Sequence, residues 1–269
     1  MERGVRHRVS IIGAGNVATH LAQALACAND VVQIYSRNIA NAACLASKIK
    51  GCEAIDDIAK LSSNVDIYVV SVKDDAIKDI AVKMPVACRN GLWVHTSGSV
   101  SMNVFSNVAE SYGVLYPLQT FSRDVAVNVG EVPFFIEGNN AKTLEKIKEV
   151  ALSVSPIVRC ADSDSRKRIH ASAVFACNFV NHMWSMADDV LNEGDFSFSL
   201  LLPLLKETLA KVAKVSPSEA QTGPARRGDI DTMTGHLALL DEDKKEIYKL
   251  LSRSIMKQYN ISTNEQNKL

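Results

Sequence analysis

A strand, a glycine-rich turn and a helix follow one another near the start of the chain, and this succession constrains the fold more than any other feature. Residues 9–12 are mostly apolar, which indicates a buried strand, and the strand ends in the sequence "GAGNVA". Residues 16–28 repeat apolar side chains at helical spacing, and residues 31–35 form a second apolar run. The spacing predicts a strand–helix–strand unit with parallel strands.

Strands and helices continue to alternate through the first half of the chain. The sequence "VDIYVVSV" at 65–72 is the strongest strand pattern. Further strands are expected at 92–95, 114–116 and 133–136, and helices at 39–49, 75–83 and 141–152. This order predicts an α/β fold with a doubly wound Rossmann-type sheet. Such sheets bind ligands beyond the carboxyl ends of their strands, so the loops that follow those ends are the candidate binding loops.

The sequence "GAGNVA" fits the pattern G-x-G-x-x-A, which binds dinucleotides when it joins a strand to a helix. Gly13 allows the tight turn, Gly15 lets a pyrophosphate approach the backbone, and Ala18 allows close helix–sheet packing. We therefore predict dinucleotide binding; a strand–helix turn without a ligand is the alternative. The cofactor-binding residues that we expect are Gly13, Gly15, Asn16, Val17, Ser36, Arg37, Ser71, Val72 and Ser97.

The end of the second strand indicates which dinucleotide binds. NAD enzymes usually carry Asp or Glu there, to accept hydrogen bonds from the ribose 2′-hydroxyl. Here Tyr35 is followed by Ser36 and Arg37 instead. A hydroxyl and a guanidinium suit a 2′-phosphate, so we predict NADP as the cofactor. A solvated charge at a strand end is the alternative interpretation of Arg37.

Two later loops are expected near the nicotinamide, "SVKDD" at 71–75 and "HTSGS" at 95–99. His95 could donate a proton there, although a single histidine at a strand end more often has a structural role. Ser97 and Gly98 suit close approach to a ligand and suit an ordinary turn equally well.

The second half of the chain is helical, beginning with a long helix expected at 165–191. Lys167, His170, Asn178 and Asn181 share one polar side of this helix. Because the polar side chains from His170 to Ser185 on this side are uncharged, apart from any charge on the histidine, we expect the side to line a substrate cleft or a subunit contact. His170 is the candidate general acid, since free histidine titrates near neutrality. Lys167 is the alternative proton donor, Asn178 a further candidate catalytic residue, and Asn181 a candidate substrate ligand.

Further helices are expected at 197–214, 217–222, 225–240 and 242–259. The sequence "TGPARRGD" at 222–229 gathers Thr222 and Arg227 around a Gly-Pro break and a new helix start. These two residues are candidates for binding an anionic substrate group. A corner between helices with a surface ion pair is the alternative. A polar hinge at 162–164 predicts two domains, a cofactor domain at 1–161 and a helical substrate and dimerisation domain at 162–269.

Composition excludes several classes of protein. The 269 residues include 30 Lys and Arg and 30 Asp and Glu, so the net charge is zero and we expect no nucleic-acid or membrane partner. The basic runs at 166–168 and 226–227 could still bind a small anion. The six cysteines are scattered, and we find neither metal-ligand spacing, signal peptide nor membrane span. We therefore expect a cytoplasmic protein without a metal ion.

Several motifs together resemble one group of bacterial proteins. They are "IIGAGNVATHLAQAL", "YSRN", "HTSGS", "YPLQTFS", "RIHASAVFACNFVNHMW" and "TGPARRGD". The group combines a Rossmann-like NADP-binding domain with a helical C-terminal domain of uncharacterised function, and is often labelled as NADP oxidoreductases. It is more remotely similar to pyrroline-5-carboxylate reductases, to 6-phosphogluconate and β-hydroxyacid dehydrogenases, and to deazaflavin-dependent NADP reductases. The resemblance implies a homodimer formed through the helical domains and a substrate bound between the two domains.

The chain departs from these relatives at their catalytic positions. β-Hydroxyacid dehydrogenases carry a lysine followed four residues later by asparagine, whereas Lys167 is followed by Ala171. Tyr116 stands where the motif "HPLQTF" would have histidine. We predict an NADP-dependent oxidoreductase that transfers hydride between the nicotinamide and a small carbonyl, imine or hydroxy substrate. The alternatives are a non-catalytic NADP(H) sensor or scaffold and, less favoured, a deazaflavin–NADP reductase.

Overall fold

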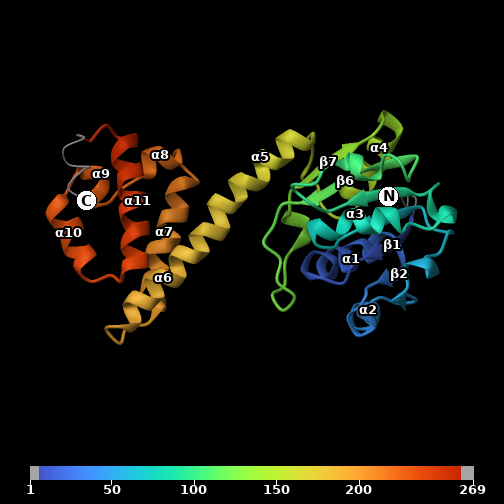
Figure 1. Ribbon diagram of the computed structural model, residues 1–269, viewed down its shortest axis with the longest axis horizontal. Helices are drawn as coiled ribbons and strands as arrows, with labels where there is room; N and C mark the ends of the chain where they lie inside the picture. Colours follow the sequence, from blue (N-terminus) through green and yellow to red (C-terminus); the bar gives the residue numbers. More distant parts are fainter. Residues whose placement is uncertain (1–5, 262–269) are drawn as a thin grey trace. The chain divides into compact units, whose positions relative to one another are not determined.

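The computed structural model describes residues 6–261, and the chain divides into two compact units, Met1–Cys177 and Asn178–Leu269. The first unit is built on a β-sheet and the second is entirely helical where it is described (Figure 1). The first unit extends beyond residue 161, where we expected a domain boundary. The next helix belongs to it because that helix buries Arg166 against the sheet.

The first unit contains one eight-stranded sheet with the order β3-β2-β1-β4-β5-β6-β7-β8. Its strands are β1 (Arg8–Ile12), β2 (Asp30–Tyr35), β3 (Glu53–Ile55), β4 (Ile67–Val70), β5 (Leu92–His95), β6 (Ser111–Pro117), β7 (Phe134–Gly138) and β8 (Val158–Cys160). All neighbours are parallel except β6 and β7, which are antiparallel. The predicted Rossmann-type, doubly wound fold is therefore confirmed.

Helices cover both faces of this sheet (Figure 1). Helices α1 (Asn16–Ala28), α2 (Ile39–Ala46) and α4 (Ala141–Leu152) pack against one face, and α3 (Asp74–Val82) packs against the other. The strands between them are almost continuously apolar because a sheet covered on both sides buries successive side chains alternately above and below. Every residue of β4 and β5 is buried.

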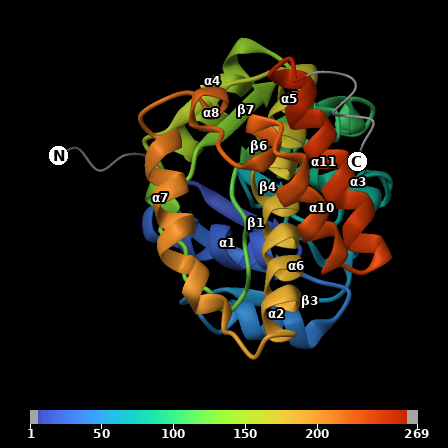
Figure 2. The ribbon, with the colours of Figure 1, turned by 90° about the vertical axis from the view of Figure 1, so that its left-hand side faces the viewer.

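The chain then continues through α5 (Ser163–Ala173), a π-helical segment (Val174–Phe179) and α6 (Val180–Asn192). The remaining helices of the second unit are α7 (Leu202–Val212), α8 (Pro217–Ala220), α9 (Pro224–Arg227), α10 (Ile230–Ala238) and α11 (Glu242–Gln258) (Figure 2). Short 3-10 helices lie at Ile58–Lys60, Val86–Cys88, Met102–Phe105, Val129–Glu131 and Phe198–Leu201. None of the helices within residues 6–261 is both long enough and apolar enough to span a membrane.

Two of the expected helices are interrupted. The helix expected at 165–191 contains the π-helical segment, which changes the angular positions of the side chains that follow it. The helix expected at 225–240 is divided at Gly228, whose φ of 70° is left-handed and ends α9. Asp229 then caps α10 by accepting a hydrogen bond from the Thr232 amide at 3.2 Å.

Candidate functional site

The turn after β1 is held against the ends of two neighbouring strands. The Gly13 amide donates a hydrogen bond to the Tyr35 carbonyl at 2.8 Å, and the Ser71 amide donates to the Ile12 carbonyl at 2.7 Å. Gly13 has a φ of 126°, and a Cβ there would lie 2.1 Å from the Ser71 carbonyl oxygen. No other residue fits this turn without moving the backbone of Ser71, directly after β4.

The N-terminus of α1 opens onto free space beside this turn. Gly15 is its N-cap residue and provides no side-chain cap, so the first amides of the helix are available. A Cβ on Gly15 would meet no atom within 4 Å, and Gly15 and Asn16 are both exposed. Uncapped amides and the positive end of the helix dipole suit a phosphate group, as predicted for a dinucleotide.

The end of β2 presents a cation without an acidic partner. Arg37 is exposed and forms no ion pair with any of the residues that the structure describes. The Ser36 hydroxyl accepts a hydrogen bond from the Asn38 amide at 3.3 Å, which leaves its proton free for another acceptor. This end of β2 adjoins the turn after β1, so Ser36 and Arg37 lie beside the glycine turn.

The ends of β4 and β5 complete this edge of the sheet. Ser71 is buried, and its hydroxyl accepts a hydrogen bond from the Thr96 hydroxyl at 3.2 Å. Val72 packs beside Gly13. The Ser97 hydroxyl accepts hydrogen bonds from the Ser99 and Val100 amides, each at 3.1 Å, and so stabilises its own turn. The structure thus gathers the predicted cofactor-binding residues at the carboxyl ends of four adjacent strands.

His95 has a structural environment. Its ring is completely buried, and its Nδ1 accepts a hydrogen bond from the Ser97 amide at 3.2 Å, so the ring proton lies on Nε2. Burial lowers the pKa of His95 to about 4, and the nearby charge of Arg166 acts in the same direction. A neutral, buried imidazole favours the structural interpretation of this residue over a proton donor.

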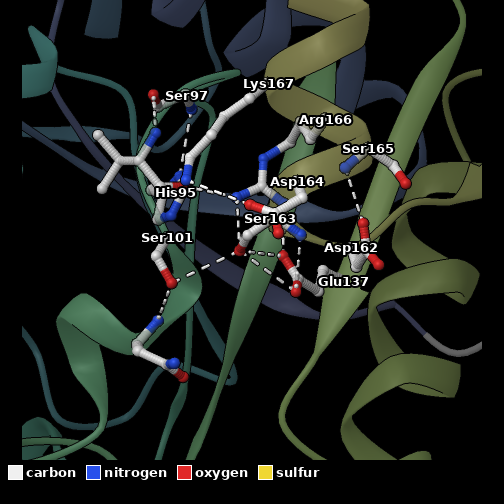
Figure 3. Close-up of polar contacts among 12 residues, drawn as sticks. His95, Ser97, Ser101, Glu137, Asp162, Ser163, Asp164, Ser165, Arg166 and Lys167 are labelled. Atoms are coloured by element: carbon white, nitrogen blue, oxygen red, sulfur yellow. Dashed lines mark hydrogen bonds and ion pairs between the residues drawn. The ribbon is translucent and has the colours of Figure 1, made fainter.

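A buried ion pair attaches α5 to the sheet. The Arg166 side chain is completely buried and pairs with the Glu137 carboxylate on β7. The same guanidinium donates to the Val100 carbonyl and, at 3.4 Å, to the Ser163 hydroxyl. Figure 3 shows these groups converging beside His95. Of the basic run that could have met an external anion, Arg166 is therefore engaged inside the first unit, where its buried Nε has no hydrogen-bond partner among the described residues.

Tyr116 and His170 form a polar pair at the end of β6. The Tyr116 hydroxyl and the His170 Nδ1 lie 3.0 Å apart, and the two rings meet edge to face at 6.0 Å. The turn after β5 is pressed against both, since a Cβ on Gly98 would lie 2.8 Å from Tyr116 Cζ and 2.9 Å from His170 Cβ. Tyr116 is buried whereas His170 is exposed. Burial, together with the carboxylate of Asp74, raises the pKa of Tyr116 to about 12.

Of the other predicted catalytic and substrate-binding residues, Lys167 lies on α5 three residues before His170, and the rest belong to the second unit. Lys167 is exposed on α5, and its Nζ lies 3.4 Å from the Asp164 carboxylate. Asn178, Asn181, Thr222 and Arg227 belong to the second unit and are exposed. The Arg227 guanidinium lies 3.9 Å from the carboxylate of Asp229. The polar side of the long helix, expected to be covered, is exposed at His170, Asn178 and Asn181.

The sequence alone does not single out Tyr116, Glu137 or Arg123 as residues of this edge. Tyr116 carried a signal, because it replaces the histidine expected in "HPLQTF". No local sequence pattern indicates Glu137 or Arg123, because their partners are distant in the sequence. Glu137 pairs with Arg166, and Arg123 donates to the Ala14 carbonyl. Across residues 6–261, no group of three or more His, Cys, Asp and Glu side chains could hold a metal ion.

Two family models match the chain. Residues 8–94 match the family described as NADP oxidoreductase, coenzyme F420-dependent, and residues 132–255 match a domain of unknown function, DUF2520. None of the curated proteins matches the sequence significantly. The first match confirms the predicted kind of cofactor domain, and the pairing of the two confirms the predicted resemblance.

Three solved structures illustrate what the chain is similar to. A provisionally named NADP oxidoreductase from Bacteroides fragilis is 39% identical, with 94% of this chain and 98% of that chain covered and a TM-score of 0.86. A Thermotoga maritima protein is 20% identical, with coverages of 94% and 98% and a TM-score of 0.68. A reductive aminase from Aspergillus terreus, solved with NADPH and ethyl-5-oxohexanoate, is 12% identical, with coverages of 97% and 90% and a TM-score of 0.64.

The last two likenesses show a shared fold alone. The first is different in kind, because identity of 39% extends over almost the whole of both chains. The chain therefore belongs to the NADP oxidoreductase family represented by the Bacteroides fragilis protein, with an F420-type NADP oxidoreductase domain followed by a DUF2520 domain.

Proposed function

We propose that this protein transfers hydride between NADP(H) and a small carbonyl, imine or hydroxy compound, with Tyr116 and His170 moving the accompanying proton. The observation that carries the proposal is the 3.0 Å contact between the Tyr116 hydroxyl and His170 Nδ1. It lies at the edge of the sheet where ligands of doubly wound folds bind. Two proteins that share this fold, a reductive aminase solved with NADPH and an imine reductase from Myxococcus stipitatus solved with NADP+, illustrate that the fold accommodates this reaction class.

The first unit fits the cofactor. Gly13 and Gly15 leave backbone amides open at the start of α1 for the pyrophosphate. Ser36 and Arg37 would hold the 2′-phosphate, and no carboxylate follows β2 to favour NAD. Bound NADP supplies or accepts a hydride, and the protein provides orientation and proton transfer.

The proton would come from the buried phenol. In the reducing direction, the Tyr116 O–H bond breaks as a new O–H or N–H bond forms on the substrate, whose carbon has gained the hydride. The Tyr116 hydroxyl is protonated before reaction, as any phenol is at neutral pH, and its raised pKa of about 12 acts in the same direction. His170, an exposed residue, would then return a proton to the phenolate through Nδ1 and replace it by exchange with solvent. In the oxidising direction the same transfers run backwards.

The test is NADPH oxidation by the full chain in the presence of pooled small ketones, aldehydes and imines. Tyr116→Phe should lower kcat by about 10²- to 10⁴-fold, the usual worth of general acid catalysis, with unchanged NADPH affinity. His170→Ala should lower kcat in the same direction. Tyr112→Phe removes a hydroxyl from the same strand and serves as the matched control, with activity near wild type. Full activity of Tyr116→Phe would remove this residue from the mechanism.

One finding favours a second reaction, hydride exchange between NADP(H) and the deazaflavin coenzyme F420. The family model that matches residues 8–94 names this coenzyme in its description. The same assay with the oxidised deazaflavin in place of the pool would detect hydride exchange between the two cofactors. NADPH binding without turnover on either would favour the sensor or scaffold alternative.

We also propose a homodimer formed through the second unit. No residue of α7 is buried, although Leu202, Leu209 and Val212 are spaced to share one of its faces. Leu209 is 70% exposed, and Leu250 on α11 is 69% exposed. Exposed apolar patches mark interaction sites, and a second copy of the same chain is the commonest partner in soluble assemblies.

A further inference from the structure

The long connection between β6 and β7 crosses the start of α1. The Asn16 side-chain amide donates to the Phe121 carbonyl at 3.0 Å, and His20 Nε2 lies 2.8 Å from the Ser122 carbonyl. The rings of His20 and Phe121 are stacked, with centroids 5.2 Å apart. Three contacts to two successive turns of α1 therefore fix residues 121–122, which we call the crossing segment together with Arg123.

Arg123 follows directly and reaches into the glycine turn. Its guanidinium donates to the carbonyl of Ala14, which lies between the two glycines of the motif. A guanidinium has five N–H donors, so this contact leaves donors for a second group. The Arg123 side chain belongs to an exposed residue, and the open space at Gly15 lies one residue beyond its acceptor.

The glycine turn needs such a charge. A dinucleotide pyrophosphate carries two negative charges, whereas a helix N-terminus offers roughly half a positive charge. Residues 13–18 contain no basic side chain. Arg123 lies where it supplies the missing charge, and it is held there by contacts that do not involve the ligand.

We infer that Arg123 binds the pyrophosphate of the dinucleotide and that the crossing segment positions it over the glycine turn. This inference rests on the proposed NADP-dependent function and adds a binding residue from a loop outside the glycine motif. The guanidinium keeps its contact with the Ala14 carbonyl and donates its remaining N–H groups to phosphate oxygens.

The test compares three ligands by calorimetry or NMR titration on the full chain: NADPH, NADH and adenosine 2′-monophosphate. Both dinucleotides contain the pyrophosphate, whereas the monophosphate contains only the 2′-phosphate. Arg123→Ala should weaken the binding of NADPH and the binding of NADH by the same factor, about 10- to 100-fold, because a charge-assisted hydrogen bond to the pyrophosphate is lost. It should leave adenosine 2′-monophosphate unchanged. Arg123→Lys, which keeps the charge, should recover part of the affinity.

Arg37→Ala is the matched control, because it should weaken NADPH and adenosine 2′-monophosphate and spare NADH. If wild type binds neither dinucleotide, the proposed function itself fails. If wild type binds both and Arg123→Ala binds them equally well, the proposed function stands and the inference about Arg123 is overturned. An equal loss for all three ligands would also overturn it, since that pattern indicates a distorted domain and not a lost pyrophosphate contact.

Discussion

The two units of this chain bury their apolar side chains to very different extents. In the first unit, every residue of β4 and β5 is buried between two large apolar clusters. In the second, the buried apolar cluster consists of Ala225, Met233 and Met256, and Leu209 is 70% exposed. The first unit therefore has a core of its own, while the second has helix faces that are stabilised only when something covers them.

This difference separates two roles. The predicted cofactor-binding residues and the proposed proton-transfer pair, Tyr116 and His170, all lie in the first unit. The second unit has the surface expected of a subunit interface. Changes in the second unit should therefore alter assembly, and changes in the first should alter stability, cofactor affinity and proton transfer.

The largest effect is expected on assembly, from Leu209→Asp. A symmetric dimer would carry the change twice. At each position an apolar side chain is lost from the interface and a carboxylate is buried there. The dimer dissociation constant should therefore rise by about 10³-fold or more. Sedimentation velocity across a range of protein concentrations measures it. Lys211→Asp introduces the same side chain on the opposite face of α7 and should leave assembly intact. A wild type that stays monomeric at every concentration would refute the dimer.

Arg166→Met should destabilise the first unit by about 3–5 kcal/mol, because Glu137 is then buried without its partner. Urea unfolding, followed by the fluorescence of Trp93 in the core of that unit, gives the free energy. Adding Glu137→Gln should restore much of the loss, since the unpaired charge is removed as well. A loss below about 1 kcal/mol in the single variant would mean that the ion pair does not anchor α5.

Acid should destabilise the first unit through His95. Its pKa is about 4 when folded and 6.5 when unfolded, so between these values the unfolded chain binds a proton that the folded chain does not. The contribution of His95 is complete above pH 6.5 and falls by about 3 kcal/mol as the pH drops to about 4. Urea unfolding across this range measures the slope. His95→Asn keeps an acceptor for the Ser97 amide and should flatten the curve; parallel curves for both proteins would contradict the assignment.

The smallest effect is expected on cofactor choice. Arg37→Ala should weaken NADPH binding by about 10- to 100-fold, because one charge-assisted contact to the 2′-phosphate is lost. The affinity for NADH should stay unchanged. Fluorescence titration with each nucleotide measures both affinities. Arg89→Ala removes another exposed arginine, before the amino end of β5, and should change neither. Equal losses for the two nucleotides in Arg37→Ala would sink the NADP assignment.

Local patterns in the sequence predicted most of the first unit. The strands that form its centre are apolar runs, and the glycine turn has a periodic helix behind it, so β1, β2, β4 and α1 were expected close to their observed positions. Strands β3 and β8 were not expected. Each has three residues and forms because neighbouring strands offer it hydrogen bonds, which no local pattern reports.

The site was less predictable because its contacts join distant parts of the chain. Tyr116 and His170 are 54 residues apart, and Arg123 and Ala14 are 109 apart. The helical pattern around His170 predicted a polar face. It could not predict the contact with Tyr116, because that residue lies on a strand far away in the sequence. Gly228 shows the opposite case, since a glycine after two arginines is a local signal for a helix end, and the unbroken helix that we expected at 225–240 overlooked it.

The most direct test of the account is calorimetric titration of the purified full chain with NADPH and with NADH. NADPH should bind at one site in each chain, and NADH should bind about 10- to 100-fold more weakly, because it lacks the phosphate for Arg37. If neither nucleotide binds, the glycine turn before α1 is a structural turn without a ligand. That result would contradict the proposed NADP-dependent function.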